Sequence, residues 1–137
     1  MADNQLFFVG QKAFIEKEDT LLLMIDPVYG LDLPGGRIQV DERNLHDALQ
    51  RELQEETQLT VTIGKPMVTW TWHVASEDRV GFLVGYQCKY RSGEVILSDE
   101  HSEYHWVTEN DAESFLRRYQ KENPELCDAI RTYFTVR

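Results

Sequence analysis

The segment from Leu45 to Thr57 most constrains the fold, because it reads as a helix whose inner face changes from apolar to acidic. Asn44 supplies an N-cap with Asp47 three residues later, and the residues that follow favour helix. At about 100° per residue, the apolar side chains form one stripe, and three carboxylates fall within about 50° of its centre. The stripe consists of Leu45, Ala48 and Leu49, and the carboxylates are Glu52, Glu55 and Glu56.

Three carboxylates within about one helical turn repel one another, because side chains three and four residues apart are neighbours on the helix surface. Two arrangements tolerate them, namely plain solvation of an acidic helix end or a divalent cation at their centre. The ligands are hard oxygens, and no Cys or His lies at a fitting spacing. A bound metal would therefore be Mg²⁺ or Mn²⁺.

A glycine turn, Leu33-Pro34-Gly35-Gly36, lies shortly before this helix. Glycine lets backbone groups approach an ion or a phosphate closely, although Gly and Pro also punctuate ordinary loops. Taken with the acidic helix, the turn predicts a site in which backbone oxygen and carboxylates surround one or more metal ions.

The remaining pattern indicates a single α/β domain over residues 1–137, because this length suits one domain and no repeat or linker divides it. Residues 27–36, rich in Pro and Gly, read as a loop. Two further helices are expected, one after the capping signal at Thr108 and one after Asn123-Pro124, with Asn123 as cap. Strands are expected at Leu6 to Ile15, Leu21 to Ile25, Leu59 to His73, Val80 to Tyr90 and Trp106-Val107.

Residues 34–59, PGGRIQVDERNLHDALQRELQEETQL, resemble the Nudix box, whose pattern is G-x5-E-x7-R-E-U-x-E-E-x-G-U with U a bulky aliphatic residue. Gly36 and Glu42 are correctly spaced, and residues 51–56 reproduce the catalytic half of the box. There are two departures: eight residues instead of seven separate Glu42 from Arg51, and Gln58 replaces the usual glycine. The first falls in the loop before the helix and the second at its end, so neither removes a ligand.

The resemblance implies an α/β/α sandwich with a mixed β-sheet and a Mg²⁺-dependent pyrophosphohydrolase, with Mn²⁺ as the other candidate metal. The expected reaction is cleavage of a diphosphate bond in a nucleoside triphosphate or in a nucleoside diphosphate linked to another moiety. By the same resemblance, Arg51 orients Glu55, and Glu42 braces the loop or binds an outer metal. The general base is Glu52 or a glutamate of a late acidic loop, Glu100 or Glu103. The expected metal ligands are the Gly35 carbonyl, Glu52, Glu55, Glu56 and Glu100, and the expected catalytic residues are Arg51, Glu52, Glu56, Glu100 and Glu103.

Substrate contacts are expected from a cation and from aromatic side chains. Arg37, directly after the glycines, is placed to touch a phosphate, unless it is an exposed loop cation. Trp70 and Trp72 alternate along one strand and so share a face, which offers a stacking surface for a nucleobase, as does Tyr104 elsewhere in the chain. Aromatic residues on strands also commonly belong to the core.

Two other functions fit the same pattern: a diphosphate isomerase of the same fold and a non-catalytic nucleotide-binding or regulatory module. The isomerase reaction requires a cysteine near the site, whereas Cys88 and Cys127 lie far from the box in sequence. Both cysteines are predicted to be reduced core residues. The three intact glutamates argue against a non-catalytic module.

The formal net charge of −10 argues against nucleic-acid polymers and anionic membranes as partners, because both are bound through clustered Lys and Arg. The longest apolar run, Leu21 to Ile25, is far shorter than the roughly 20 residues of a membrane span. A cytoplasmic enzyme with a small-molecule nucleotide or diphosphate substrate is therefore expected. Homodimers are frequent in the resembled family, so a homodimer is a further expectation.

Overall fold

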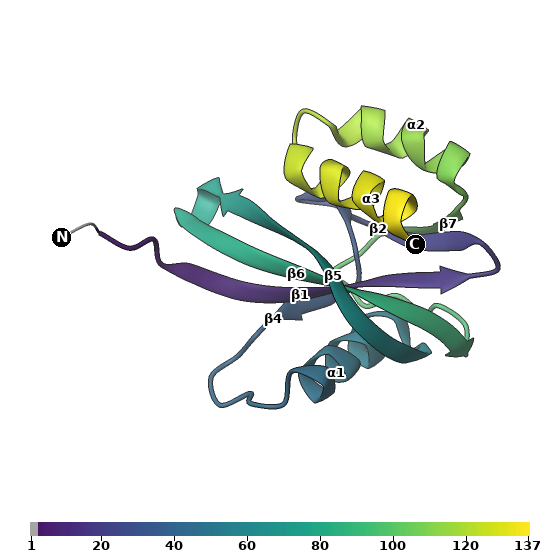
Figure 1. The fold of residues 1–137 in the computed structure, drawn as a ribbon, viewed down its shortest axis with the longest axis horizontal. Helices are drawn as coiled ribbons and strands as arrows, with labels where there is room; N and C mark the ends of the chain where they lie inside the picture. Colours follow the sequence, from purple (N-terminus) through teal and green to yellow (C-terminus); the bar gives the residue numbers. More distant parts are fainter. Residues whose placement is uncertain (1–2) are drawn as a thin grey trace.

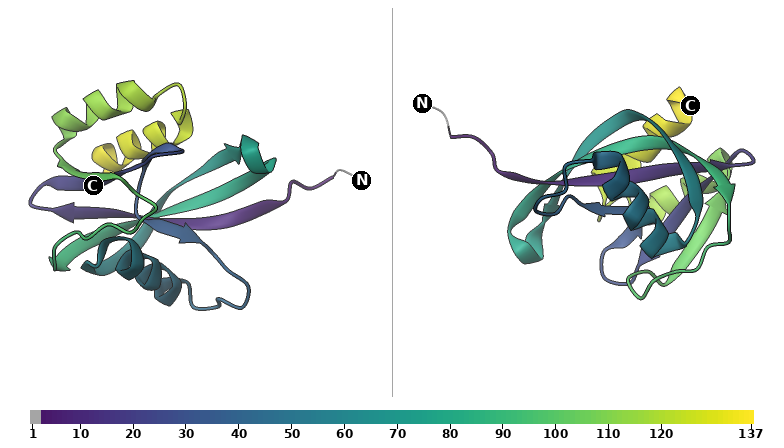
Figure 2. Two further views of the ribbon diagram at one scale, coloured as in Figure 1. Left: turned by 180° about the vertical axis from the view of Figure 1, so that it is seen from behind. Right: turned by 90° about the horizontal axis from the view of Figure 1, so that it is seen from below.

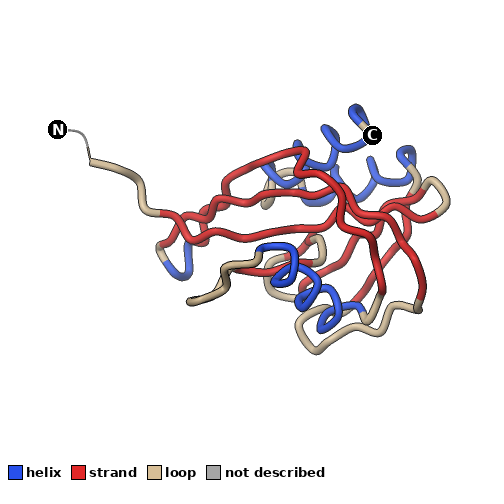
Figure 3. The backbone as a smooth tube through the Cα atoms, turned by 60° about the horizontal axis from the view of Figure 1, so that its bottom comes forward, coloured by secondary structure: helices blue, strands red, loops and turns tan. Residues whose placement is uncertain are grey.

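The computed structural model describes residues 3–137 as three layers, with a sheet between one helix and a pair of helices (Figure 1). The helices are α1 (Leu45–Thr57), α2 (Glu109–Tyr119) and α3 (Pro124–Val136), and a 3-10 turn, η1 (Ala75–Glu77), joins two strands. Turned views keep α1 on one side of the strands and α2 and α3 on the other (Figures 2 and 3). The strands are β1 (Phe7–Lys17), β2 (Thr20–Asp26), β3 (Gly30–Asp32), β4 (Gly35–Arg37), β5 (Thr60–Val74), β6 (Arg79–Ser92) and β7 (Glu103–Val107).

The sheet is mixed, which confirms the predicted α/β/α sandwich. Its strand order is β3-β2-β1-β6-β5, with β4 pairing with β1 and β7 pairing with β2. The central pair, β1 and β6, is parallel, whereas β5 and β6 form an antiparallel hairpin. Because β4 pairs with β1 and precedes α1 in the chain, the sheet fixes the position of the glycine pair before the helix.

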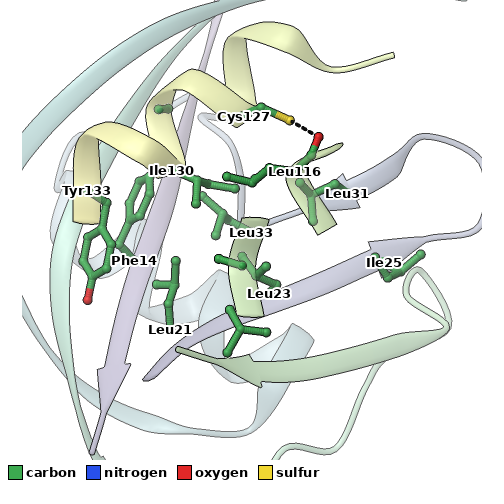
Figure 4. Packing of buried hydrophobic residues seen from close by; sticks show 13 residues of the cluster. Phe14, Leu21, Leu23, Ile25, Leu31, Leu33, Leu116, Cys127, Ile130 and Tyr133 are labelled. Atoms are coloured by element: carbon green, nitrogen blue, oxygen red, sulfur yellow. Dashed lines mark hydrogen bonds between the residues drawn. The ribbon is translucent and has the colours of Figure 1, made fainter. Parts of the chain in front are cut away.

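Two apolar clusters hold the layers together. One lies between the sheet and the α2–α3 pair, where Phe14 stacks on Tyr133 with ring centroids 5.3 Å apart (Figure 4). The other packs Leu49 and Leu53 of α1 against the opposite face. Both cysteines are buried as predicted, and burial raises the pKa of Cys88 to about 12 and that of Cys127 to about 11. Neither thiol lines the cleft described below.

The predicted helices agree with the structure at their starts. Asn44 caps α1 by accepting from the Asp47 N–H, and Thr108 caps α2 in the same way through Asp111. The N-terminus of α3 differs, because the Asn123 side chain makes no capping hydrogen bond and donates instead to the carbonyl of Tyr29. Leu45 was wrongly placed in the apolar stripe, since it is 44% exposed in the first turn of α1.

The loop predicted over residues 27–36 was wrong in part, because two three-residue strands, β3 and β4, lie in and beyond it. Each of these strands exists because a neighbouring strand supplies its pairing partner, and its own residues give no strand pattern. Gly36, for example, pairs with Gln11 of β1. The strand predicted at Trp106-Val107 begins earlier, at Glu103, where β7 pairs with β2.

Gln58 ends α1 in the left-handed conformation, with φ 59° and ψ 19°. Glycine adopts this conformation without the Cβ penalty, so Gln58→Gly is expected to raise the free energy of unfolding by up to about 1 kcal/mol. Urea unfolding at pH 7 measures the difference, and a neutral or destabilising result would contradict the argument. Gly93 also has a positive φ and serves as a control for the opposite change. Gly93→Ala is expected to lower the free energy of unfolding.

Candidate active site

The glycine pair and the end of α1 are joined directly. The Gly35 N–H donates to Glu56 Oε2 at 2.8 Å, and the Glu56 side chain is buried, with only 5% of the residue exposed. A Cβ built on Gly36 would lie 2.4 Å from the carboxyl carbon of Glu52. Both glutamates therefore press against a backbone that has no side chains at this point.

Arg51 holds three carboxylates at once. Its Nη2 lies 2.9 Å from Glu42 Oε2 and 3.1 Å from Glu52 Oε1, and its Nη1 lies 3.2 Å from Glu55 Oε2. Glu42 also accepts from the Gln39 N–H at 2.8 Å, so it braces the loop before α1. The extra residue of the box is absorbed in that loop, because the ion pair between Glu42 and Arg51 still forms.

A second charged group in the same cleft gave no signal in the sequence. Lys12 Nζ lies 2.9 Å from Asp32 Oδ1, and His101 Nε2 lies 2.9 Å from Asp32 Oδ2. These residues come from β1, β3 and the loop before β7, so only the folded sheet brings them together.

Burial raises the pKa of Glu56 to about 7, although Lys12 and the Gly35 N–H act in the opposite direction. Burial also raises the pKa of Glu52, partly offset by Arg51. Asp32 behaves differently: burial would raise its pKa, but Lys12 and His101 outweigh burial and lower it. Glu52 and Glu56 thus lie where a negative charge is costly without a cation.

The late acidic loop contributes Glu100 but not Glu103. Single ligand atoms of Glu56, Glu100 and His101 all lie within 4.8 Å of one another. Glu103 instead starts β7, and its carboxylate lies 3.4 Å from His105 Nε2. Of the two candidates, only Glu100 lines the cleft.

The predicted site residues divide into two sets. Residues that line the cleft, which has a volume of about 320 Å³, are Gly35, Arg37, Glu52, Glu56, Trp70, Trp72 and Glu100. Those that do not are Arg51, Glu55, Glu103 and Tyr104. Arg51 acts behind the cleft through Glu52, whereas Glu55 is 58% exposed on the outer side of the ion-pair network.

Aromatic side chains form the far wall of the cleft. Trp72 makes edge contacts with Tyr29 and Phe8, at centroid distances of 5.3 Å and 6.4 Å. The Arg37 guanidinium lies 4.0 Å from the centroid of the Phe8 ring and makes two 2.8 Å hydrogen bonds to Glu77. Arg37 lies at the end of β4 and lines the cleft, and its side chain is 38% exposed.

The donor set fits a hard divalent cation. Carboxylate oxygens of Glu52, Glu56 and Glu100 share one cleft, and oxygen ligands are those that Mg²⁺ and Mn²⁺ prefer. His101 Nδ1 is buried and has no hydrogen-bond partner among residues 3–137, and one ring nitrogen of His101 lies within 4.8 Å of carboxylate oxygens of Glu56 and Glu100. The residues present thus match the metal expected from the sequence.

Without metal, the contribution of Glu56 to the free energy of unfolding should fall as the pH rises. The pKa of Glu56 rises from 4.5 to about 7 on folding, so the folded chain binds more protons in that window and loses stability as the pH rises through it. Glu56→Gln removes this loss and should be more stable than the native chain by up to about 3 kcal/mol above pH 7, with no gain below pH 4.5. Urea unfolding in a chelator from pH 4 to pH 8 measures the difference, and a pH-independent difference would contradict the prediction.

Comparisons with known proteins agree on one family. The family model described as NUDIX domain matches residues 8–129. A search of curated proteins finds no significant match.

Similar solved structures carry related descriptions. A NUDIX hydrolase from Nitrosomonas europaea is 20% identical, with a TM-score of 0.75 over 95% of this chain and 90% of that one. A MutT protein from Methanosarcina mazei Go1 is 25% identical, with a TM-score of 0.68 over 89% and 99%. An ADP-ribose pyrophosphatase from Streptococcus suis is 24% identical, with a TM-score of 0.61 over 76% and 75%.

Proposed function

Because the chain belongs to the NUDIX family and is a hydrolase of the pyrophosphatase type, we propose that it cleaves a diphosphate bond in a nucleotide with Mg²⁺ as cofactor. The substrate is a nucleoside diphosphate linked to another moiety, or a nucleoside triphosphate. Mn²⁺ is the alternative metal. Residues 1–137 act as one domain.

One observation carries this proposal: the buried carboxylate of Glu56, bonded to the Gly35 N–H, shares a cleft with Glu52 and Glu100 and with an aromatic wall. Glu52, Glu56, Glu100 and the Gly35 carbonyl would hold the metal. When bound, the metal neutralises phosphate oxygens and lowers the pKa of the attacking water. Glu55 contributes to binding through the charge of the network around Arg51.

The proton of the attacking water passes to a carboxylate of the cleft. Glu52 and Glu100 are the two candidates, since both line it, whereas Glu103 is paired with His105 on β7. Arg51 orients Glu52 through the 3.1 Å contact between Nη2 and Oε1. Glu52 therefore has a fixed direction, as a base or a ligand requires.

The aromatic wall favours a nucleotide base as the second recognition element. Trp70, Trp72 and Tyr29 line the same cleft as the carboxylates. Two similar structures are described as an ADP-ribose pyrophosphatase and a UDP-X diphosphatase, which supports a nucleoside diphosphate derivative. Arg37, anchored by Glu77, retains N–H groups for a substrate phosphate.

The remaining expectations concern membranes, nucleic acids, oligomeric state and location. No helix within residues 3–137 is long and apolar enough to cross a membrane. The acidic surface again disfavours nucleic-acid polymers. A homodimer and a cytoplasmic location remain predictions.

The test is a hydrolysis assay on the native chain. A panel containing nucleoside triphosphates, nucleotide sugars, ADP-ribose and dinucleoside polyphosphates is incubated with Mg²⁺, with Mn²⁺ and with a chelator, and the released phosphates are identified. The proposal expects cleavage of a diphosphate bond in at least one compound only when the metal is present. Binding of nucleotides without turnover across the panel would instead favour the non-catalytic module.

A diphosphate isomerase is the less favoured reading. Neither Cys88 nor Cys127 lines the cleft, so no thiol is available there for protonation of an isoprenoid double bond. Including an isopentenyl diphosphate in the same panel separates the two reactions, because isomerisation releases no phosphate.

A further inference from the structure

Lys12 is a cation in a cleft whose charged side chains are mostly carboxylates, beside Asp32 and near Glu56. Its side chain is 16% exposed, and Nζ bonds both Asp32 Oδ1 at 2.9 Å and the carbonyl of Leu33 at 3.1 Å. In the sheet, Lys12 pairs with Gly35, the residue whose N–H binds Glu56. Although burial would lower the pKa of Lys12, Asp32 and Glu56 raise it, so the side chain stays charged.

Two groups of potential metal ligands meet in this cleft and share His101. One consists of Asp26, Asp32 and His101, and the other of Glu56, Glu100 and His101. The first group is already engaged: Asp32 pairs with Lys12, and Asp26 Oδ1 accepts from two backbone N–H groups. A divalent cation bound to Asp32 would lie close to the ammonium and be repelled by it.

We propose that Lys12 acts as a permanent cation within the metal site, neutralising Asp32 and confining the divalent ion to the side of Glu56 and Glu100. This inference rests on the proposed function, because it requires that those glutamates bind the metal. Lys12 thereby positions the ion and weakens its binding, without itself being a ligand. The positive charge of Lys12 therefore stays in the cleft even when no metal ion is bound.

The proposal makes two predictions of opposite sign. Removing the charge of Lys12 removes a repulsion and should tighten divalent-cation binding. Removing the charge of Asp32 leaves the ammonium without its partner and should weaken binding. Removing both charges should return the affinity close to the native value, whereas a purely structural ion pair would produce no such reversal.

The experiment measures Mn²⁺ binding by calorimetry without substrate, at low ionic strength. Native chain, Lys12→Met, Asp32→Asn and the double variant are compared, with Lys12→Arg as the charge-preserving control. A unit charge about 6 Å from a divalent ion is worth roughly tenfold in Kd even at the dielectric constant of water. We therefore expect Kd to fall about tenfold in Lys12→Met, to rise about tenfold in Asp32→Asn, and to stay within about threefold of native in the double and Arg variants.

Circular dichroism and thermal unfolding establish that each variant is folded. If Lys12→Met fails to fold, Asp32→Asn and the double variant still decide, since the double variant removes both charges of the Lys12–Asp32 pair. A native chain that binds Mn²⁺ through Glu56, with Kd unchanged within about twofold in the single variants, would overturn this proposal and leave the proposed function standing. A native chain that binds no Mn²⁺ would overturn both.

Discussion

Glu56→Gln is expected to lower metal-dependent hydrolysis by at least about a hundredfold while the chain stays folded. The amide has the same shape as the carboxylate, and its oxygen can still accept the Gly35 N–H that now lies 2.8 Å away. What it lacks is the charge that holds a divalent cation. The measurement is kcat/KM at saturating Mg²⁺, on whichever substrate the panel identifies.

The matched control is Glu94→Gln, which makes the same chemical change at an exposed position outside the cleft. Native activity is expected for this variant, so a loss specific to residue 56 cannot be ascribed to the lost charge in general. If Glu56→Gln retains more than half of the native activity, residue 56 is not a metal ligand in this chain.

Gly35→Ala is expected to destabilise the chain by at least about 4 kcal/mol. Gly35 has φ 143°, and a Cβ there would lie 2.0 Å from the Gln11 carbonyl oxygen and 2.9 Å from the Lys12 Cα. Both obstacles are backbone atoms of the paired strand β1. β1 cannot move away without breaking the hydrogen bond that the Ala13 N–H donates to the Pro34 carbonyl. Urea unfolding of the variant, or its failure to accumulate as folded protein, measures the effect.

Gly36→Ala provides the contrast one residue further on. The three atoms nearest to its Cβ would all belong to the carboxylate of Glu52, the far end of a flexible side chain. The free energy of unfolding should therefore change by no more than about 1 kcal/mol, while hydrolysis falls at least about tenfold because Glu52 is displaced. Equal losses of stability in the two variants would contradict the distinction between the two glycines.

What could be predicted from the sequence was local. The bounds and the N-cap of α1 follow from residues within the helix and next to it, and they agree with the structure. The spacing of Gly36, Glu52 and Glu56 likewise belongs to one continuous segment.

What could not be predicted depends on contacts between distant segments. β3 and β4 contain three residues each, too few for a periodic pattern, and exist only because β2 and β1 supply their partners. Lys12 and His101 are 89 positions apart, and no local signal connects either of them with Asp32. Arg37 could be predicted to lie at the cleft, but its partner Glu77 is 40 positions away.

The parallel pairing of β1 with β6 sets the order in which the molecule can assemble. Ten residues of β1, from Phe7 to Glu16, pair with β6, whereas only Glu16 and Lys17 pair with β2. During synthesis from the N-terminus, the central strand therefore waits for residues 80–89 before its main partner exists. Lys12 lies on β1 and Gly35 pairs with it, so we expect the cleft to form only after β6 has been synthesised. A ribosome-bound chain that ends before β6 would contain all of α1, with its three glutamates, but not the strand that is the main partner of β1.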